Sequence, residues 1–151
     1  MIFAVALEAA AAAQGGVVVF PQCGSGFLGL TYLMSRSETT AVFSGTVVEA
    51  RHPDAAVIVT FEVDRVWKGA ISKRTALYRP NPASTDSRQV FDLGERYVVL
   101  AHSLTAAERA QFHIETAPPD ALAVGLCGDG SRPFKFAEPE LTELGPGRPP
   151  Q

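Results

Sequence analysis

The chain has few of the residues that catalytic and metal-binding sites most often use. Its 151 residues include two cysteines, three histidines and one tryptophan. Neither cysteine belongs to a Cys-x-x-Cys motif, which argues against a zinc knuckle or a dithiol redox site. His52, His102 and His113 show no His-x-x-x-His spacing, so we expect solvated or packed histidines and no metal site. Acidic residues such as Asp129 fall on predicted loops, where solvation accounts for them.

Long apolar runs and strong net charge are also absent. No run approaches the roughly 18 apolar residues that a membrane helix requires, so we expect no membrane span. The formal net charge is −3, and the 13 Lys and Arg residues are scattered. A general nucleic-acid or anionic-membrane binder would carry a basic patch instead. With 46% hydrophobic and 19% charged residues, the composition is that of one compact domain.

Residues 1–16 differ in composition from the rest of the chain. Residues 2–7 are apolar, Glu8 follows, and residues 9–13 are all alanine. This pattern resembles a signal peptide that would be cleaved before Gln14, although it has no basic n-region. An Ala-rich helix, or a start site placed downstream of the true one, would explain the same residues. We therefore expect either a signal peptide or an Ala-rich N-terminal segment.

Short strands separated by turns dominate the remaining sequence. Val59, Phe61 and Val63 alternate along one face, and Val66 then shifts the phase, which predicts a bulge or bend where the strand turns. A second strand is expected over residues 41–49, with Gly45 at a bulge or tight bend. Further strands are predicted over 74–78, over 96–101 and in the region before Cys127. The 96–101 run is apolar enough to be buried on both faces or to lie in a barrel wall.

The helical signals are short. Thr105-Ala-Ala-Glu108 has the capping-box pattern and predicts a helix that ends near Phe112. Residues 138–144 suit one or two helical turns, and the Gly/Pro-rich 145–151 segment predicts a disordered tail. The sequence shows no alternation of strands and helices that would predict an α/β sheet instead. The pattern predicts a mainly β domain over residues 17–144, a small closed OB-fold-like β-barrel of five to six strands with one or two short helices.

Four segments then follow one another in a distinctive order. They are Val42-Phe-Ser-Gly-Thr-Val47, Val59-Thr-Phe-Glu-Val-Asp-Arg-Val-Trp-Lys-Gly69, Phe91-Asp-Leu-Gly-Glu-Arg-Tyr-Val-Val-Leu-Ala101, and Cys127 with a closing Glu-Leu-Gly. Their order and spacing resemble the TIMP-like (netrin-module) proteins of bacterial type. The resemblance implies an OB-fold barrel, export from the cytoplasm, and disulfides that tie an N-terminal Cys-x-Cys segment to the barrel.

The cysteines depart from that family pattern in a consistent way. From the residues alone, Cys23 and Cys127 are either a disulfide, if the chain is exported, or two free thiols. The family's Cys-x-Cys falls on Pro21-Gln22-Cys23, and the partner of its first cysteine falls on Ser87-Arg88. Two cysteines that would pair are absent together, whereas Cys23 and Cys127, which the resemblance pairs, are both present. The resemblance therefore implies a Cys23–Cys127 disulfide in a secreted or cell-envelope protein.

The same departure bears on how such a module would act. In the animal inhibitors that resemble it, the amine and carbonyl of the leading cysteine chelate the zinc of a metalloprotease. Pro21 stands at that position and has no primary amine, so we do not expect zinc-chelating inhibition. By family analogy, the partner-binding surface is an N-terminal ridge with the loop near residues 80–88. The ridge residues are Pro21, Gln22, Cys23, Gly24 and Ser25.

Two other classes of function stay open. One is a thiol-dependent enzyme with Cys23 as nucleophile and His102 as base, for which no Asn or Asp orienter can be placed from the sequence. The other is an intracellular nucleic-acid-binding OB-fold with Phe61 and Trp67 as a stacking platform, but few basic residues flank these rings. We expect Phe61 in the core and Trp67 at the barrel end. The favoured function is a non-catalytic, cofactor-free, monomeric module that binds a protein partner such as a protease.

Overall fold

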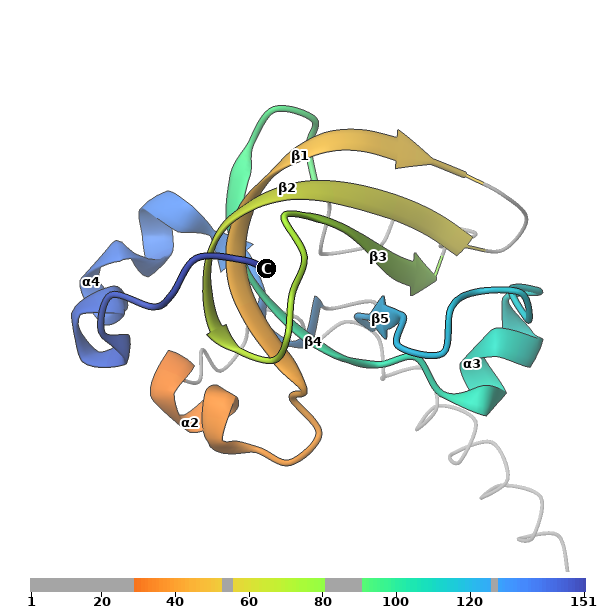
Figure 1. Ribbon diagram of the computed structural model, residues 1–151, viewed down its shortest axis with the longest axis horizontal. Helices are drawn as coiled ribbons and strands as arrows, with labels where there is room; N and C mark the ends of the chain where they lie inside the picture. Colours follow the sequence, from red (N-terminus) through yellow and green to blue (C-terminus); the bar gives the residue numbers. More distant parts are fainter. Residues whose placement is uncertain (1–28, 53–55, 81–90, 126–127) are drawn as a thin grey trace, which may run out of the picture.

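A computed structural model describes residues 29–52, 56–80, 91–125 and 128–151 (Figure 1). In chain order its elements are α2 (Leu30–Ser35), β1 (Ala41–Arg51), β2 (Ala56–Lys68), β3 (Arg74–Pro80), β4 (Arg96–Ser103), α3 (Ala106–Gln111), β5 (Leu122–Ala123), the 3-10 turn η1 (Gly128–Gly130), β6 (Arg132–Pro133) and α4 (Phe134–Leu144). The predicted strands are present, whereas α2 was not predicted. No helix within the described ranges is long and apolar enough to cross a membrane.

Five strands close into a barrel. The sheet order is β1-β2-β3-β5-β4, and β4 pairs back onto β1, so β1 has a partner along each edge. All neighbours in the barrel are antiparallel except β3 and β5. The two-residue strand β6 adds to β4 outside the ring. This arrangement confirms the prediction of a mainly β, OB-fold-like barrel with short helices (Figure 1).

Bulges in the β1–β2 ladder explain the shifted phase of β2. Ser44 lies opposite Arg65 and Gly45 lies opposite Val63, so Asp64 is the extra residue between them. The bulge lets Val66 return to the interior face, where it is buried with Val63. The sequence predicted a bulge or bend after Val63 and a bulge or tight bend at Gly45, and the register shift between Ser44 and Gly45 confirms both predictions.

The position of Gly45 in this ladder leads to a testable prediction. A Cβ atom at residue 45 would lie 2.8 Å from the carbonyl oxygen of Glu62 and 3.2 Å from the Cα of Val63. Both are backbone atoms of the paired strand and cannot rotate away. We expect Gly45→Ala to lower the free energy of unfolding by about 1–3 kcal/mol, measured by urea denaturation.

The matched control is Gly29→Ala. The nearest atom to a Cβ at residue 29 is a carboxylate oxygen of Glu140 at 3.9 Å, which is ordinary contact. Its free energy of unfolding should change by no more than about 0.5 kcal/mol. Equal losses in the two variants would contradict the close-approach explanation for Gly45.

Aromatic side chains fill the barrel interior. Phe61 is completely buried and meets three other rings edge-to-face, with centroid distances of 5.7 Å to Phe43, 5.4 Å to Phe91 and 6.4 Å to Tyr97. The Tyr97 hydroxyl accepts a hydrogen bond of 2.8 Å from the backbone N–H of Asp92, and this bond anchors the turn before β4. The interior is packed as in other small barrels, and the expected core position of Phe61 is confirmed.

A second apolar cluster lies outside the barrel, beneath α2 and α4. Its buried members are Leu30, Leu33, Val42, Val98, Leu100 and Ala137. Because Val98 and Leu100 point into this cluster while Val99 and Ala101 point into the barrel, β4 is buried on both faces, as predicted. Trp67 packs here, against the outer cluster, and the expectation that it closes the barrel end was wrong.

Residues 145–151 pair with the barrel, whereas their Gly/Pro-rich composition predicted a disordered tail. Val66 and Arg148 exchange two backbone hydrogen bonds of 2.8 and 2.9 Å, and Gln151 donates to the carbonyl of Ile71 at 2.9 Å. The physical reason lies in β2, because β3 pairs with it only as far as Glu62. Beyond that point the N–H of Val63 still bonds to the carbonyl of Lys73, but both backbone groups of Val66 take their partner from Arg148, so the folded domain extends past residue 144.

Candidate functional site

The residues chosen from the sequence for binding lie outside the part of the chain that the structure describes. They are Pro21, Gln22, Cys23, Gly24, Ser25 and Cys127, together with residues 81–88 of the loop predicted near residues 80–88. The Cys23–Cys127 disulfide and the ridge therefore stay predictions. The described residues contain two other candidates, a histidine held by two carboxylates and a groove beside α4.

His102, on β4, lies between two carboxylates from different elements. Its Nδ1 contacts Oδ2 of Asp129 in η1, and its Nε2 lies 2.9 Å from Oε2 of Glu108 in α3. The capping box predicted from the sequence fixes Glu108, since Thr105 N–H donates to its carboxylate at 2.9 Å and Thr105 Oγ1 accepts from its N–H at 3.1 Å. The second oxygen of Asp129 accepts from Gly125 N–H at 3.0 Å. The cluster thus joins β4, α3 and the turn before η1.

The electrostatics of this cluster decide what it can do. Hydrogen bonding to Asp129 is the main reason that the pKa of His102 is raised from its ordinary value of 6.5 to about 9; burial opposes the rise, and Glu108 adds to it. The imidazole is therefore protonated at neutral pH, with both nitrogens engaged. A general base requires a neutral ring with one free nitrogen. The geometry describes an ion-pair clamp between elements and does not suit base catalysis.

The structure also bears on the two chemistries considered for this histidine. The first is a thiol-dependent enzyme, for which the sequence offered no residue to orient His102. The structure places Asp129 at Nδ1 of His102, but Glu108 occupies Nε2, the nitrogen that would have to accept a proton from the thiol. In the described ranges, no group of three or more His, Cys, Asp or Glu side chains could hold a metal ion. Asp129 itself, expected as a solvated loop residue, was the partner that sequence reasoning missed.

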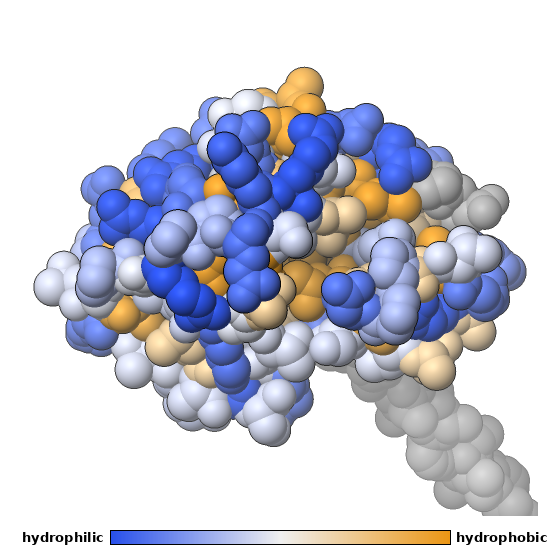
Figure 2. All heavy atoms as spheres, viewed as in Figure 1, coloured by the Kyte–Doolittle hydropathy of each residue, from blue (hydrophilic) through white to orange (hydrophobic). Residues whose placement is uncertain are grey.

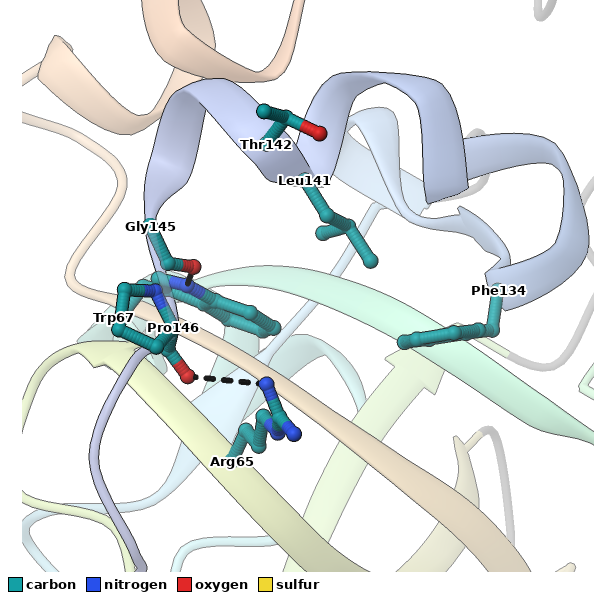
Figure 3. Close-up of a pocket in the computed structure, with 7 residues that line it drawn as sticks. All are labelled: Arg65, Trp67, Phe134, Leu141, Thr142, Gly145 and Pro146. Carbon is teal, nitrogen blue, oxygen red and sulfur yellow. Dashed lines mark hydrogen bonds between the residues drawn. The ribbon is translucent and has the colours of Figure 1, made fainter.

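The second candidate is a groove between β2 and α4, which we call the α4 groove (Figure 3). Its volume is about 380 Å³. Its lining residues are Arg65, Trp67, Phe134, Leu141, Thr142, Gly145 and Pro146. Figure 3 shows the rings of Trp67 and Phe134 on two sides of the open space, with Leu141 above it and the Arg65 guanidinium below.

Hydrogen bonds and a stacked cation fix the walls of the α4 groove. Trp67 Nε1 donates to the carbonyl of Gly145 at 2.9 Å, and an Arg65 terminal nitrogen donates to the carbonyl of Pro146 at 3.2 Å. Arg96 stacks on the Phe134 ring at 3.5 Å and pairs with Asp64 at 3.0 Å. Aromatic faces beside guanidinium groups suit an apolar ligand group that carries a polar or anionic end.

Comparison with known proteins finds no family model and no curated protein that matches this chain. The class of protein is therefore defined by fold and site. It is a small OB-fold-like β-barrel whose outer face carries two helices, with a groove along α4 and an ion-paired histidine at the end of β4.

Proposed function

We propose that this chain is a secreted or cell-envelope module that binds a protein partner and performs no chemistry, similar in type to the TIMP-like (netrin-module) proteins. One observation carries the proposal. Residues 42–47 and 59–68 of the motif segments lie on β1 and β2, residues 96–101 lie on β4, and β1 pairs with both of the other strands. Segments that are separate in the sequence thus form one continuous wall of an OB-fold-like barrel, which is the scaffold that the resemblance implies.

The chemistry of the described residues supports binding over catalysis. The His102 clamp engages both ring nitrogens, and the interior of the barrel is packed with its own side chains. Partners would therefore meet the outer surface. Zinc-chelating inhibition is not part of the proposal, because Pro21 stands where the chelating cysteine would be.

Alkylation and substitution of Cys23 test the proposed function. The Cys23–Cys127 disulfide would hold the predicted ridge of residues 21–25 against the barrel, so capture of a protein partner from envelope or culture fractions should require it. We expect the native chain to resist iodoacetamide unless reductant is added, as measured by mass spectrometry, and to keep its partner after that treatment. Cys23→Ser should lose most of the capture.

The matched control is Ser72→Ala, an exposed change outside both the ridge and the cysteines, which should capture the partner as the wild type does. Alkylation of Cys23 in the native chain without reductant would contradict the disulfide and favour the thiol enzyme. Potent inhibition of a zinc protease by the wild-type chain would overturn the argument from Pro21.

A further inference from the structure

One edge of β2 is left open by its neighbour in the sheet. β3 pairs with β2 between Ala56 and Glu62, and the N–H of Val63 then donates to the carbonyl of Lys73 at 2.7 Å as the two strands separate. β2 continues to Lys68, paired with β1 along its other edge. We call the side of β2 from Arg65 to Lys68 that faces away from β1 the β2 edge. An open edge of this kind accepts an added strand.

The 145–151 segment occupies the β2 edge as an added strand would. Figure 1 shows it leaving α4 and crossing to the barrel. Arg148 exchanges two backbone hydrogen bonds with Val66, at 2.8 and 2.9 Å, in antiparallel sense. Farther along, Gln151 donates to Ile71 at 2.9 Å and accepts from Lys73 at 3.3 Å. The guanidinium of Arg148 also donates to the carbonyl of Gly69.

The β2 edge selects the residue types that lie on it. Gly147 has φ +72°, and a Cβ there would meet the Val66 carbonyl oxygen at 3.1 Å and the Trp67 ring at 3.2 Å. Only glycine fits both the conformation and the space. Pro149 and Pro150 line a hollow of about 650 Å³ together with Thr46, Val48, Glu62, Val63, Asp64 and Lys73. Prolines favour an extended backbone and lower the entropy cost of ordering it, so they suit such a site.

The segment is attached by its backbone and by the Arg148 guanidinium, and it buries little apolar surface. Pro146, Gly147, Arg148 and Pro149 are exposed, and none of the apolar clusters among the described residues includes a member of the segment. Figure 2 shows hydrophilic side chains across this face of the molecule, with hydrophobic residues between them. An element that adds no side chain to an apolar cluster can open locally without unfolding the domain. A peptide that makes the same bonds can therefore take its place.

We propose that the β2 edge is a peptide-binding site, that the 145–151 segment is its internal pseudo-ligand, and that its external ligand is an extended Gly-Pro-Gly-Arg-Pro-type segment of a partner protein. The proposal rests on the proposed function and specifies the partner's chemistry. Binding would add one antiparallel strand to β2, with an arginine at Gly69 and a glycine under Trp67.

Trp67 supplies a direct readout. It is the single tryptophan of the chain, and its Nε1 bonds to Gly145 at the start of the segment. In the full chain, Gly147→Val should detach the segment and leave the site open. A synthetic heptapeptide with the sequence of residues 145–151 should then give a saturable change in Trp67 fluorescence, with a Kd at least tenfold lower than for the wild type. The same heptapeptide with valine at its third position should bind neither chain.

Gly94→Val is the matched control. It introduces the same side chain at a similar positive φ of +84°, in open space and away from the segment, so it should respond to the peptide as the wild type does. Should Gly147→Val fail to fold by circular dichroism, Arg148→Ala is the second variant. It removes the contact with Gly69 and leaves β2 unchanged, and it should bind the peptide several-fold more tightly than the wild type.

Three outcomes would overturn the proposal. The first is a folded, detached variant with no saturable response, and the second is equal binding of the valine-containing heptapeptide. The third is a concentration-dependent wild-type dimer, dissolved by the peptide in sedimentation experiments, which would assign the site to a second copy. If the Gly147→Val chain does not respond to the heptapeptide while the wild-type chain still captures its partner, only the β2-edge proposal is overturned. If the wild-type chain captures no partner while the Gly147→Val chain still binds the heptapeptide, only the proposed function as a secreted binding module is overturned.

Discussion

Replacing Phe61 with alanine is expected to lower the free energy of unfolding by about 3–5 kcal/mol, the range for large aromatic truncations in packed cores. Phe61 is completely buried, and the rings of Phe43, Phe91 and Tyr97 surround it. These rings come from β1, β4 and the turn before β4, so they cannot all move into the space that the truncation leaves. Urea denaturation followed by circular dichroism measures the loss.

Phe136→Ala is the matched control for this substitution. The Phe136 side chain belongs to α4 and is 64% exposed, so the same truncation should change the free energy of unfolding by less than about 0.5 kcal/mol. Domains of this size are typically stable by about 5–15 kcal/mol, so the Phe61 variant should unfold at much lower urea concentrations. A loss below about 1 kcal/mol for Phe61→Ala would contradict the packed interior.

His102 should make the stability depend on pH in the alkaline range. Its pKa of about 9 in the folded chain lies above the ordinary value of 6.5, so protonation favours the folded state. The stabilisation is complete below about pH 6.5, declines between pH 6.5 and 9, and is lost above pH 9. The raised pKa of His102 corresponds to at most roughly 3 kcal/mol of stabilisation, because solvent still partly screens a side chain that is 22% exposed.

The measurement is the free energy of unfolding in urea from pH 5.5 to 10, for the wild type and His102→Gln. The difference between the two should shrink as the pH rises, because only the wild type loses a proton from this site. Exposed His52 supplies the control, and His52→Gln should reproduce the wild-type profile. Asp129→Asn removes the largest cause of the raised pKa and should move the decline to lower pH. Parallel profiles for the wild type and His102→Gln would show that the clamp does not stabilise the fold.

The barrel could be predicted because its signals are local. Alternation along β2, the phase shift at Val66 and the glycine at residue 45 each report backbone geometry within a few residues.

α4 was only partly predicted. A start at residue 138 would place Pro139 in the first turn, where proline is favoured, whereas the helix begins at Phe134 and continues through Pro139. Packing of Ala137 against the outer cluster accounts for the longer helix.

The sites depend on contacts between distant parts of the chain, and the sequence carried little sign of them. Glu108 was the exception, because the capping box oriented it six residues after His102. Asp129 follows His102 by 27 positions and reaches it only because η1 packs against β4. The β2 edge likewise exists because β3 separates from β2 at Glu62, and no residue type encodes that separation.

The two-sided pairing of β1 has a consequence for how the chain folds during synthesis. One edge of β1 pairs with β2, which follows it directly in the chain. Its other edge pairs with β4, and the pairs Thr46–Arg96 and Ala41–Ala101 are separated by 50 and 60 positions in the sequence. A nascent chain released as far as β3 would be an open three-stranded meander with the backbone of β1 bare along one side. Such an intermediate can associate with other chains, so efficient production should depend on how soon the ribosome delivers β4.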